Sequence, residues 1–196
     1  MMLACRMRRR HGMRRRVFAL AVCALPGLAL AQSPGEKRAA TNQLLDALKN
    51  APSEAAAAPL ELRIRELWAT AGTPAVTLLM SRGLRELHAG ADADAIEDFG
   101  DAITLDPTLA EAYHQRAVAR YQAGDTAGAI ADLEATVRRE PRDFAAFETL
   151  SRIAEASEDW KGAYAAWQKV IEIDPKTPGG EDRLKELKRK AFGEET

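Results

Sequence analysis

Apolar residues recur along most of the chain at the spacing of amphipathic helices. After Ser53, a suitable helix N-cap, Leu60 is followed by Ile64, Leu67, Trp68 and Ala71, which share one face of a helix that Pro59 either starts or kinks. The same spacing recurs in eight other segments. With that helix, the chain is predicted to form helices over 38–49, 60–71, 76–89, 93–105, 109–123, 126–139, 144–157, 160–173 and 181–192.

The central helices repeat with a fixed period. Pro107, Pro141 and Pro175 stand 34 residues apart, each after an acidic residue that ends a helix. The same step relates Gly90 to Gly124 and runs through Ala95, Ala129 and Ala163. A constant period of this length indicates stacked helix–turn–helix units, none of which buries its apolar face alone. The predicted repeats are 76–109, 110–143 and 144–177.

These residues resemble the tetratricopeptide repeat (TPR) family. The family's small residues, where the first helix (A) and second helix (B) of a repeat meet, correspond to Gly83, Ala117 and Ser151 in A and to Ala95, Ala129 and Ala163 in B. Glu158 replaces the turn glycine in the third repeat. The resemblance implies an all-α solenoid, a right-handed superhelix of antiparallel helix pairs. Leu67-Trp68 and Gly72-Thr73-Pro74 also resemble exported proteobacterial TPR proteins.

Segments outside the repeat register flank the three units. Residues 32–75 read as a short linker and a degenerate N-terminal helix pair, either an altered repeat or a cap. Pro178-Gly179-Gly180 breaks the chain, and residues 178–196 then form a C-terminal capping helix and tail. This helix is predicted to cover the last repeat and to carry a polar outer side.

Residues 1–31 have the features of a secretory signal peptide. Arg14-Arg15-Arg16 precedes an apolar stretch that ends in Ala29-Leu30-Ala31, an A-x-A cleavage signal, and Met13 is an alternative start. Cleavage removes seven arginines and both cysteines, leaving 21 basic against 29 acidic residues. We therefore expect a periplasmic, soluble protein with a net charge of −8. That charge disfavours nucleic acid as a partner, and no stable membrane insertion is expected after cleavage.

The sequence lacks the patterns of a catalytic or cofactor site. It contains no phosphate-binding glycine loop, nucleophile elbow or H-E-x-x-H motif, so we do not expect an enzyme or a cofactor. His88 and His114 occupy different repeat positions, and no cysteine follows the signal peptide to complete a zinc set. No metal is therefore expected. His114 is interpreted as a residue of the groove or the surface.

Two pairs of opposite charges follow the repeat. Arg82 and Asp98 are separated by the same number of residues as Arg116 and Asp132, whereas the third repeat has Leu150 and Ala166 there instead. Because the arginine and the aspartate are both present in two repeats and both missing from the third, we predict an ion pair between helices A and B of a repeat. Unrelated surface charge is the alternative interpretation.

The TPR resemblance implies that the concave face of the A helices binds a protein or peptide. The candidate groove residues are Met80, Leu84, Leu87, His114, Val118, Tyr121, Glu148 and Arg152. The Lys and Asn residues of the chaperone-tail carboxylate clamp are missing at the corresponding positions. We therefore expect an exported scaffold or adaptor. The alternatives are an accessory factor that holds a client for envelope enzyme or cytochrome maturation, and a self-associating homo-oligomer.

Overall fold

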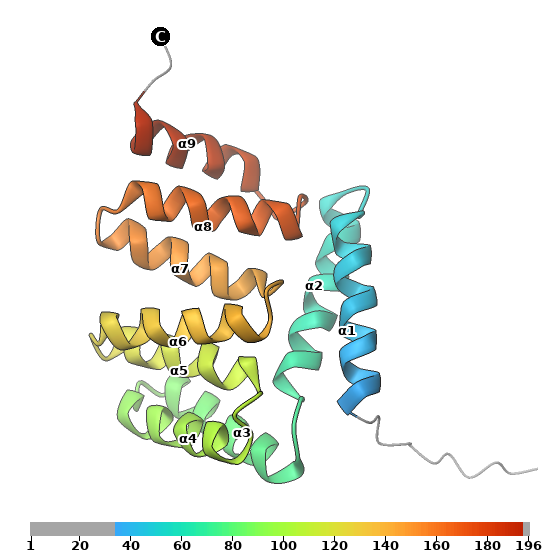
Figure 1. The fold of residues 1–196 in the computed structure, drawn as a ribbon, viewed down its shortest axis with the longest axis vertical. Helices are drawn as coiled ribbons and strands as arrows, with labels where there is room; N and C mark the ends of the chain where they lie inside the picture. The colour runs from blue at the N-terminus through green and yellow to red at the C-terminus, as the bar shows by residue number, and fades with distance from the viewer. Residues whose placement is uncertain (1–33, 194–196) are drawn as a thin grey trace, which may run out of the picture. The chain divides into compact units, whose positions relative to one another are not determined.

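The computed structural model describes residues 34–193, which form nine α-helices and no strand (Figure 1). The predicted signal peptide lies outside these residues. The all-α prediction is confirmed, and the helices are α1 (Pro34–Lys49), α2 (Glu54–Ala69), α3 (Pro74–His88), α4 (Asp92–Leu105), α5 (Ala110–Gln122), α6 (Thr126–Arg139), α7 (Phe144–Ala156), α8 (Trp160–Ile173) and α9 (Gly180–Phe192). None of these helices is long and apolar enough to cross a membrane.

Helix starts follow local capping chemistry. Thr73 accepts a hydrogen bond from the Val76 amide before α3, which has Pro74 in its first turn. α1 begins at Pro34, four residues before the predicted start, so part of the expected linker is helical. Proline suits this position because the N–H group that it lacks would have no hydrogen-bond partner in the first turn of a helix. Aspartate side chains cap the starts of α6, α7 and α8. Each accepts a hydrogen bond from the backbone amide three residues further on, and these aspartates are Asp125, Asp143 and Asp159.

The three A–B turns share a left-handed backbone conformation. Its φ angle is 75° at Gly90, 87° at Gly124 and 58° at Glu158. Glycine adopts this conformation without a Cβ penalty, whereas a glutamate there is strained. The third turn therefore keeps the repeat geometry despite its substitution.

Within each repeat the two helices pack at small residues. A Cβ added at Gly83 would lie 2.8 Å from Cε1 of Phe99, and Ala129 is fully buried against the helix carrying Ala117. Ser151 donates a hydrogen bond of 3.0 Å to the Ala163 carbonyl oxygen, joining α7 to α8. These contacts confirm the predicted close approaches between helices A and B.

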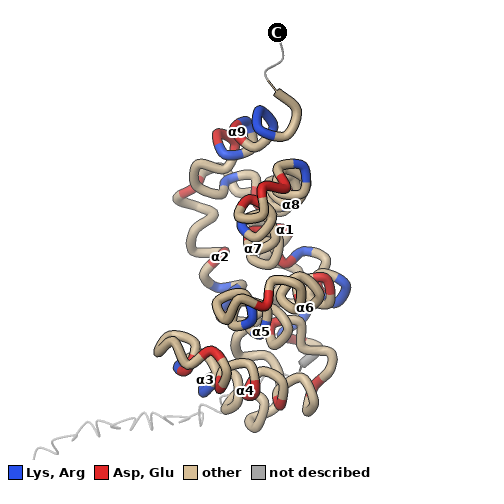
Figure 2. The backbone as a smooth tube through the Cα atoms, turned by 90° about the vertical axis from the view of Figure 1, so that its left-hand side faces the viewer, with Lys and Arg blue, Asp and Glu red and all other residues tan. Residues whose placement is uncertain are grey.

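α9 covers the end of the last repeat, as predicted. Leu187 is buried with Val170 and Trp167 of α8. The Trp167 indole donates a 2.8 Å hydrogen bond to the Gly180 carbonyl oxygen, and the Arg183 guanidinium lies 4.6 Å from the Trp167 ring centroid. Basic and acidic residues alternate on the rest of the helix (Figure 2).

The N-terminal pair α1–α2, here called the N-terminal hairpin, crosses the ends of helices in the later repeats (Figure 1). Its buried side chains Leu45, Leu48 and Ile64 pack in one cluster with Phe144 of α7 and Ile173 of α8. That this pair is an altered repeat or a terminal cap stays a prediction; its buried contacts are with the third repeat. The apolar stripes of α1 and α2 are buried against the third repeat, which offers Phe144 and Ile173 as partners.

Candidate functional site

The predicted groove residues come from α3, α5 and α7, and the face on which the sequence pattern places them is here called the A-helix face. At one end of this face, α2 runs across the start of α5 and α7. Arg65 of α2 places Nη2 3.3 Å from Oε2 of Glu148, and its guanidinium stacks 4.6 Å from the Phe144 ring centroid. The Trp68 ring lies 5.5 Å from the same ring. The chain thus places one of its own helices on the face predicted to bind a partner.

The face divides into a covered half and an open half. The covered half consists of the residues at the end that α2 crosses, Glu111, His114, Ala145 and Glu148. The open half consists of Leu84, Val118 and Tyr121, which are half-buried, and Arg152, which is exposed. Met80 and Leu87 belong to the core between the first two repeats, with exposures of only 1% and 8%.

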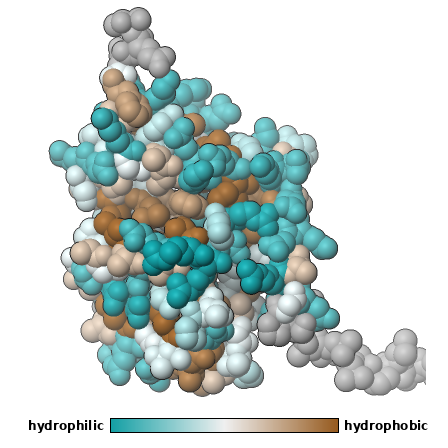
Figure 3. Space-filling view, viewed as in Figure 1, coloured by the Kyte–Doolittle hydropathy of each residue, from teal (hydrophilic) through white to brown (hydrophobic). Residues whose placement is uncertain are grey.

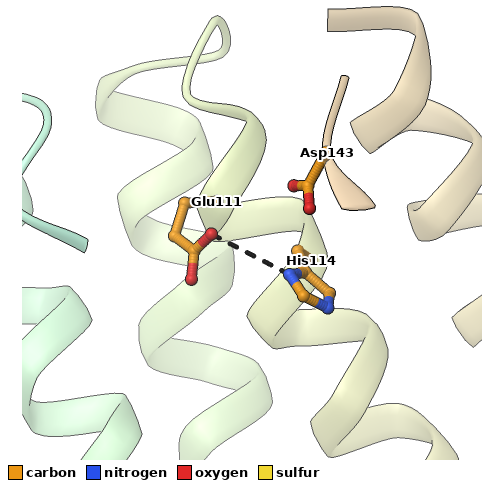
Figure 4. Close-up of side chains that lie close together, drawn as sticks. All are labelled: Glu111, His114 and Asp143. Carbon is orange, nitrogen blue, oxygen red and sulfur yellow. Dashed lines mark ion pairs between the residues drawn. The ribbon is translucent and has the colours of Figure 1, made fainter. Parts of the chain in front are cut away.

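His114 is 6% exposed, so its interpretation as an open groove or surface residue is wrong. It is enclosed because its position on α5 faces the neighbouring repeat: Thr149 of α7 lies against its ring, with Oγ1 3.3 Å from Nε2. Glu111 and Asp143 flank the other side of the ring (Figure 4). The sequence analysis did not single out these two carboxylates. The Glu-x-x-His spacing of Glu111 and His114 was the available signal, whereas Asp143 comes from the turn before α7.

The hydrogen bonds around His114 determine its tautomer. The Thr149 hydroxyl donates to the Ala145 carbonyl oxygen at 3.0 Å, so its oxygen accepts from Nε2–H of His114. Nδ1 then faces Glu111, whose Oε2 is 3.8 Å away, too far for a hydrogen bond. The neutral ring therefore directs an unpartnered lone pair toward acidic side chains.

The electrostatics of this cluster favour a positive charge on or beside the ring. Burial lowers the pKa of His114, but Glu111 and Asp143 outweigh it, so the pKa is raised above its ordinary 6.5. Burial also raises the pKa of Asp143 to about 6, against the opposing effect of His114. Each partner therefore favours the charged form of the other, while burial opposes both charges.

A cavity of about 480 Å³ lies between the N-terminal hairpin and the first two repeats. Apolar side chains of α2 and the α4–α5 turn, including Leu67, Trp68 and Leu109, form part of its wall. Glu111 also lines it, so the His114 cluster borders this space.

The predicted ion pairs between helices A and B are present. Arg82 binds Asp98 through two hydrogen bonds, and Arg116 binds Asp132 in the same way. Arg120 adds a contact that the repeat pattern did not indicate, with Nη1 2.8 Å from Oδ2 of Asp132. These pairs join helices A and B within the first and second repeats.

The third repeat has an apolar cleft where the other two repeats have the ion pair. Its volume is about 270 Å³, and its lining includes Leu150, Ala166, Ile153 and Ile130. Figure 3 shows an apolar band between the level of α6 and that of α7 and α8. Replacement of Arg and Asp by Leu150 and Ala166 thus exchanges a charged contact for a half-buried apolar surface.

Comparison of the sequence with known proteins finds repeat proteins. No family model matches the chain. A TPR repeat-containing protein from Rhizobium etli is 25% identical over 155 residues, covering 79% of this chain and 76% of that protein. Mouse tetratricopeptide repeat protein 36 is 50% identical over 56 residues, which cover 29% of this chain and only 30% of that protein.

Comparison of the structure gives the same result. The TPR domain of Sgt2 from Aspergillus fumigatus has a TM-score of 0.55 and 26% identity, covering 60% of this chain and 80% of that one. The first TPR of Spaghetti (RPAP3), solved with the HSP90 peptide SRMEEVD, has a TM-score of 0.56 and 18% identity, covering 60% and 94%. With its 34-residue period and paired helices, this chain is similar to tetratricopeptide repeat proteins and has the fold of an all-α TPR solenoid.

Proposed function

We propose that this protein is an exported scaffold that binds a segment of another protein on the A-helix face. The observation that carries the proposal is the docking of α2 on that face. Arg65 pairs with Glu148, and Ile64 and Trp68 pack around Phe144. The face therefore has the apolar and charged groups that bind an amphipathic helix of this chain, and its open half offers similar groups to a partner.

The open half favours a partner segment with apolar side chains. Leu84 and Val118 present aliphatic surface, and Tyr121 combines a ring with a hydroxyl, which suits a partly hydrated contact. Arg152 adds a positive charge at the edge, and Thr149 accepts one of its N–H groups at 3.2 Å. An amphipathic or extended peptide fits this combination.

The comparisons support a peptide-binding role in general terms. The RPAP3 repeat domain was solved with an HSP90 peptide bound. The present chain has Met80, His114 and Glu148 where the chaperone-tail clamp uses its polar residues. Met80 and His114 are buried, and Glu148 is half-buried. A different peptide chemistry is therefore proposed for this protein.

Export to the periplasm is part of the proposal and rests on residues 1–31. There the scaffold would act as an adaptor, or it would hold a client during maturation of an envelope enzyme or cytochrome. Loss of a covalent cofactor from a periplasmic protein in a deletion strain would select the maturation role. Normal cofactor attachment in that strain would leave the adaptor role.

The test is affinity capture from envelope extract. We expect the double variant Leu84→Glu with Arg152→Glu to lose the captured protein while its helical content and melting temperature stay close to those of the wild type. Glu97→Lys, on the exposed side of α4, is the control and should leave capture intact. Loss of capture in the control with retention in the double variant would move the binding site to the B-helix side.

Self-association is a second candidate, favoured by the apolar cleft at Leu150 and Ile153. Ile130 is 37% exposed at its rim. If two copies bury this cleft, light scattering should show a dimer for the wild type and a monomer for Ile130→Glu. A monomer for both proteins would exclude this candidate.

A further inference from the structure

The buried cluster of Glu111, His114 and Asp143 has the composition of a metal site. The three side chains offer one ligand atom each, and these atoms lie within 4.8 Å of one another. Two carboxylates and an imidazole come together from α5 and from the turn before α7 (Figure 4). Neither the TPR architecture nor the proposed peptide binding uses this cluster.

When His114 is neutral, none of the three side chains of the cluster carries a positive charge. His114 is 94% buried, and its Nδ1 has no hydrogen-bond partner. Nε2–H is held by Thr149, so the Nδ1 lone pair points toward Glu111 and Asp143. A buried lone pair that faces carboxylates is unfavourable unless a proton or a metal ion lies between them.

One oxygen of each carboxylate accepts a hydrogen bond from an N–H group, and the other oxygen remains as a possible metal ligand. Oδ1 of Asp143 caps α7 by accepting from the Ala146 amide at 2.9 Å. Oε1 of Glu111 accepts from Gln115 at 2.6 Å, while Oε2 lies on the side of His114. Arg65, another cation that acts on this site, is engaged with Glu148.

The donor atoms of the cluster suit a first-row divalent ion. Zinc binds histidine nitrogen and carboxylate oxygen at about 2.0–2.2 Å, so ligands on one ion lie roughly 3.3 Å apart. The His114–Glu111 separation of 3.8 Å needs only a small side-chain rotation to reach that spacing. Thr149 supplies the outer contact that orients a ligating imidazole, as is usual at metal sites.

The site also has a route for entry. Glu111 lines the cavity of about 480 Å³ beneath the N-terminal hairpin. An ion entering through this cavity would meet Glu111 first. This arrangement satisfies the requirement for access to a buried site.

We propose that Glu111, His114 and Asp143 bind a divalent first-row metal ion, of which Zn²⁺ is the probe. Binding exchanges the proton of a charged His114 for the metal, because the ion takes the Nδ1 lone pair. The Glu-x-x-His spacing relates only two of the ligands, since the third, Asp143, comes from the turn before α7.

Titration calorimetry of the full chain with Zn²⁺ tests the proposal. Cys5→Ser and Cys23→Ser are included in every variant to remove thiols as competing ligands. We expect one Zn²⁺ per chain and a higher melting temperature with zinc present. Asp143→Asn retains a side chain that caps α7, but it should weaken zinc binding at least about tenfold and abolish the shift in melting temperature.

Two controls separate a metal ligand from a structural residue. Asp159→Asn changes the equivalent cap of α8, and His88→Gln changes an exposed histidine; both should bind zinc like the parent. His114→Gln should lose binding while its melting temperature without zinc stays within a few degrees of the parent's. Equal zinc binding by the parent and Asp143→Asn, or no binding by either, would overturn the proposal and leave a proton as the cation of this cluster.

Discussion

Arg116 and Asp132 are joined by two parallel hydrogen bonds, from Nε to Oδ2 at 2.8 Å and from Nη2 to Oδ1 at 2.7 Å. Their side chains are only 18% and 6% exposed, so solvent screens this pair less than a surface ion pair. The pair connects helices A and B of the second repeat, and Arg120 approaches the same carboxylate.

A double-mutant cycle on this pair should show coupling. We expect a coupling free energy above about 1 kcal/mol, because the two groups are largely buried and the geometry is bidentate. Asp132→Ala should be more destabilising than Arg116→Leu, since it leaves two guanidinium groups without their acceptor. Chemical denaturation provides the free energies of unfolding, and strict additivity of the two changes would contradict the finding.

Ala129 should not tolerate a larger side chain. It is fully buried where α5 and α6 meet, so Ala129→Leu should destabilise the protein by about 1–3 kcal/mol through overpacking. The matched change Ala131→Leu on the exposed side of α6 should be close to neutral. Equal melting temperatures for the two variants would contradict this packing.

Replacing Glu158 by glycine should stabilise the protein. Its φ of 58° lies in the left-handed region, where a residue with a Cβ is strained. Glu158→Gly should therefore raise stability by about 1 kcal/mol in urea denaturation. The reverse change Gly124→Glu, at the same position of the second repeat, should lower it by a similar amount. Opposite signs would mean that side-chain contacts of Glu158 outweigh its backbone strain.

Glu61 should make docking of the N-terminal hairpin depend on pH. Burial and the neighbouring Asp174 carboxylate raise the pKa of Glu61 from its ordinary 4.5 to about 7. Because the folded-state pKa is the higher one, its contribution to stability is fully present below pH 4.5 and is lost as the pH rises to about 7.

The variant Glu61→Gln removes this titration. We expect it to melt at a higher temperature than the wild type at about pH 8 and at the same temperature at about pH 4. Glu97→Gln on α4 serves as the control and should change neither value. A stabilisation of equal size at both pH values would show that titration of Glu61 does not account for it.

Processing should leave Gln32 as the first residue of the mature protein. Ala29 and Ala31 provide the small side chains that signal cleavage needs, and the arginines at 14–16 precede the apolar stretch. N-terminal sequencing of the protein from the periplasmic fraction measures this directly. Recovery of Arg14–Arg16 in that fraction would contradict cleavage at Ala31.

The periodic part of the chain could be predicted closely from its sequence. The bounds of α6 and α8 agree with the prediction, because apolar spacing, an aspartate cap and a closing acidic-proline pair all mark the same ends. The Arg116–Asp132 pair could also be predicted, since it follows the repeat.

The remaining features of the fold and of the candidate site depend on contacts between residues that the 34-residue repeat does not relate. Arg142 reaches Asp46, 96 positions earlier in the chain, and no local pattern relates these two residues. The environment of His114 likewise combines Glu111 with Asp143, from the turn before α7, and with Thr149 of the next repeat. Sequence spacing placed His114 on the A-helix face but gave no information about α2, which covers that end of it.

The contacts of the N-terminal hairpin have a consequence for the order of folding. In an ordinary solenoid each unit needs only its neighbour, so folding proceeds as the chain is synthesised. Here Asp46 and Asn42 bind Arg142, each at 2.6 Å, and Leu48 and Ile64 are buried only when Phe144 and Ile173 are present. The apolar stripes of α1 and α2 therefore stay exposed during synthesis until the third repeat has followed. Such distant pairings slow folding, so this short repeat protein should fold as one late, cooperative step instead of repeat by repeat.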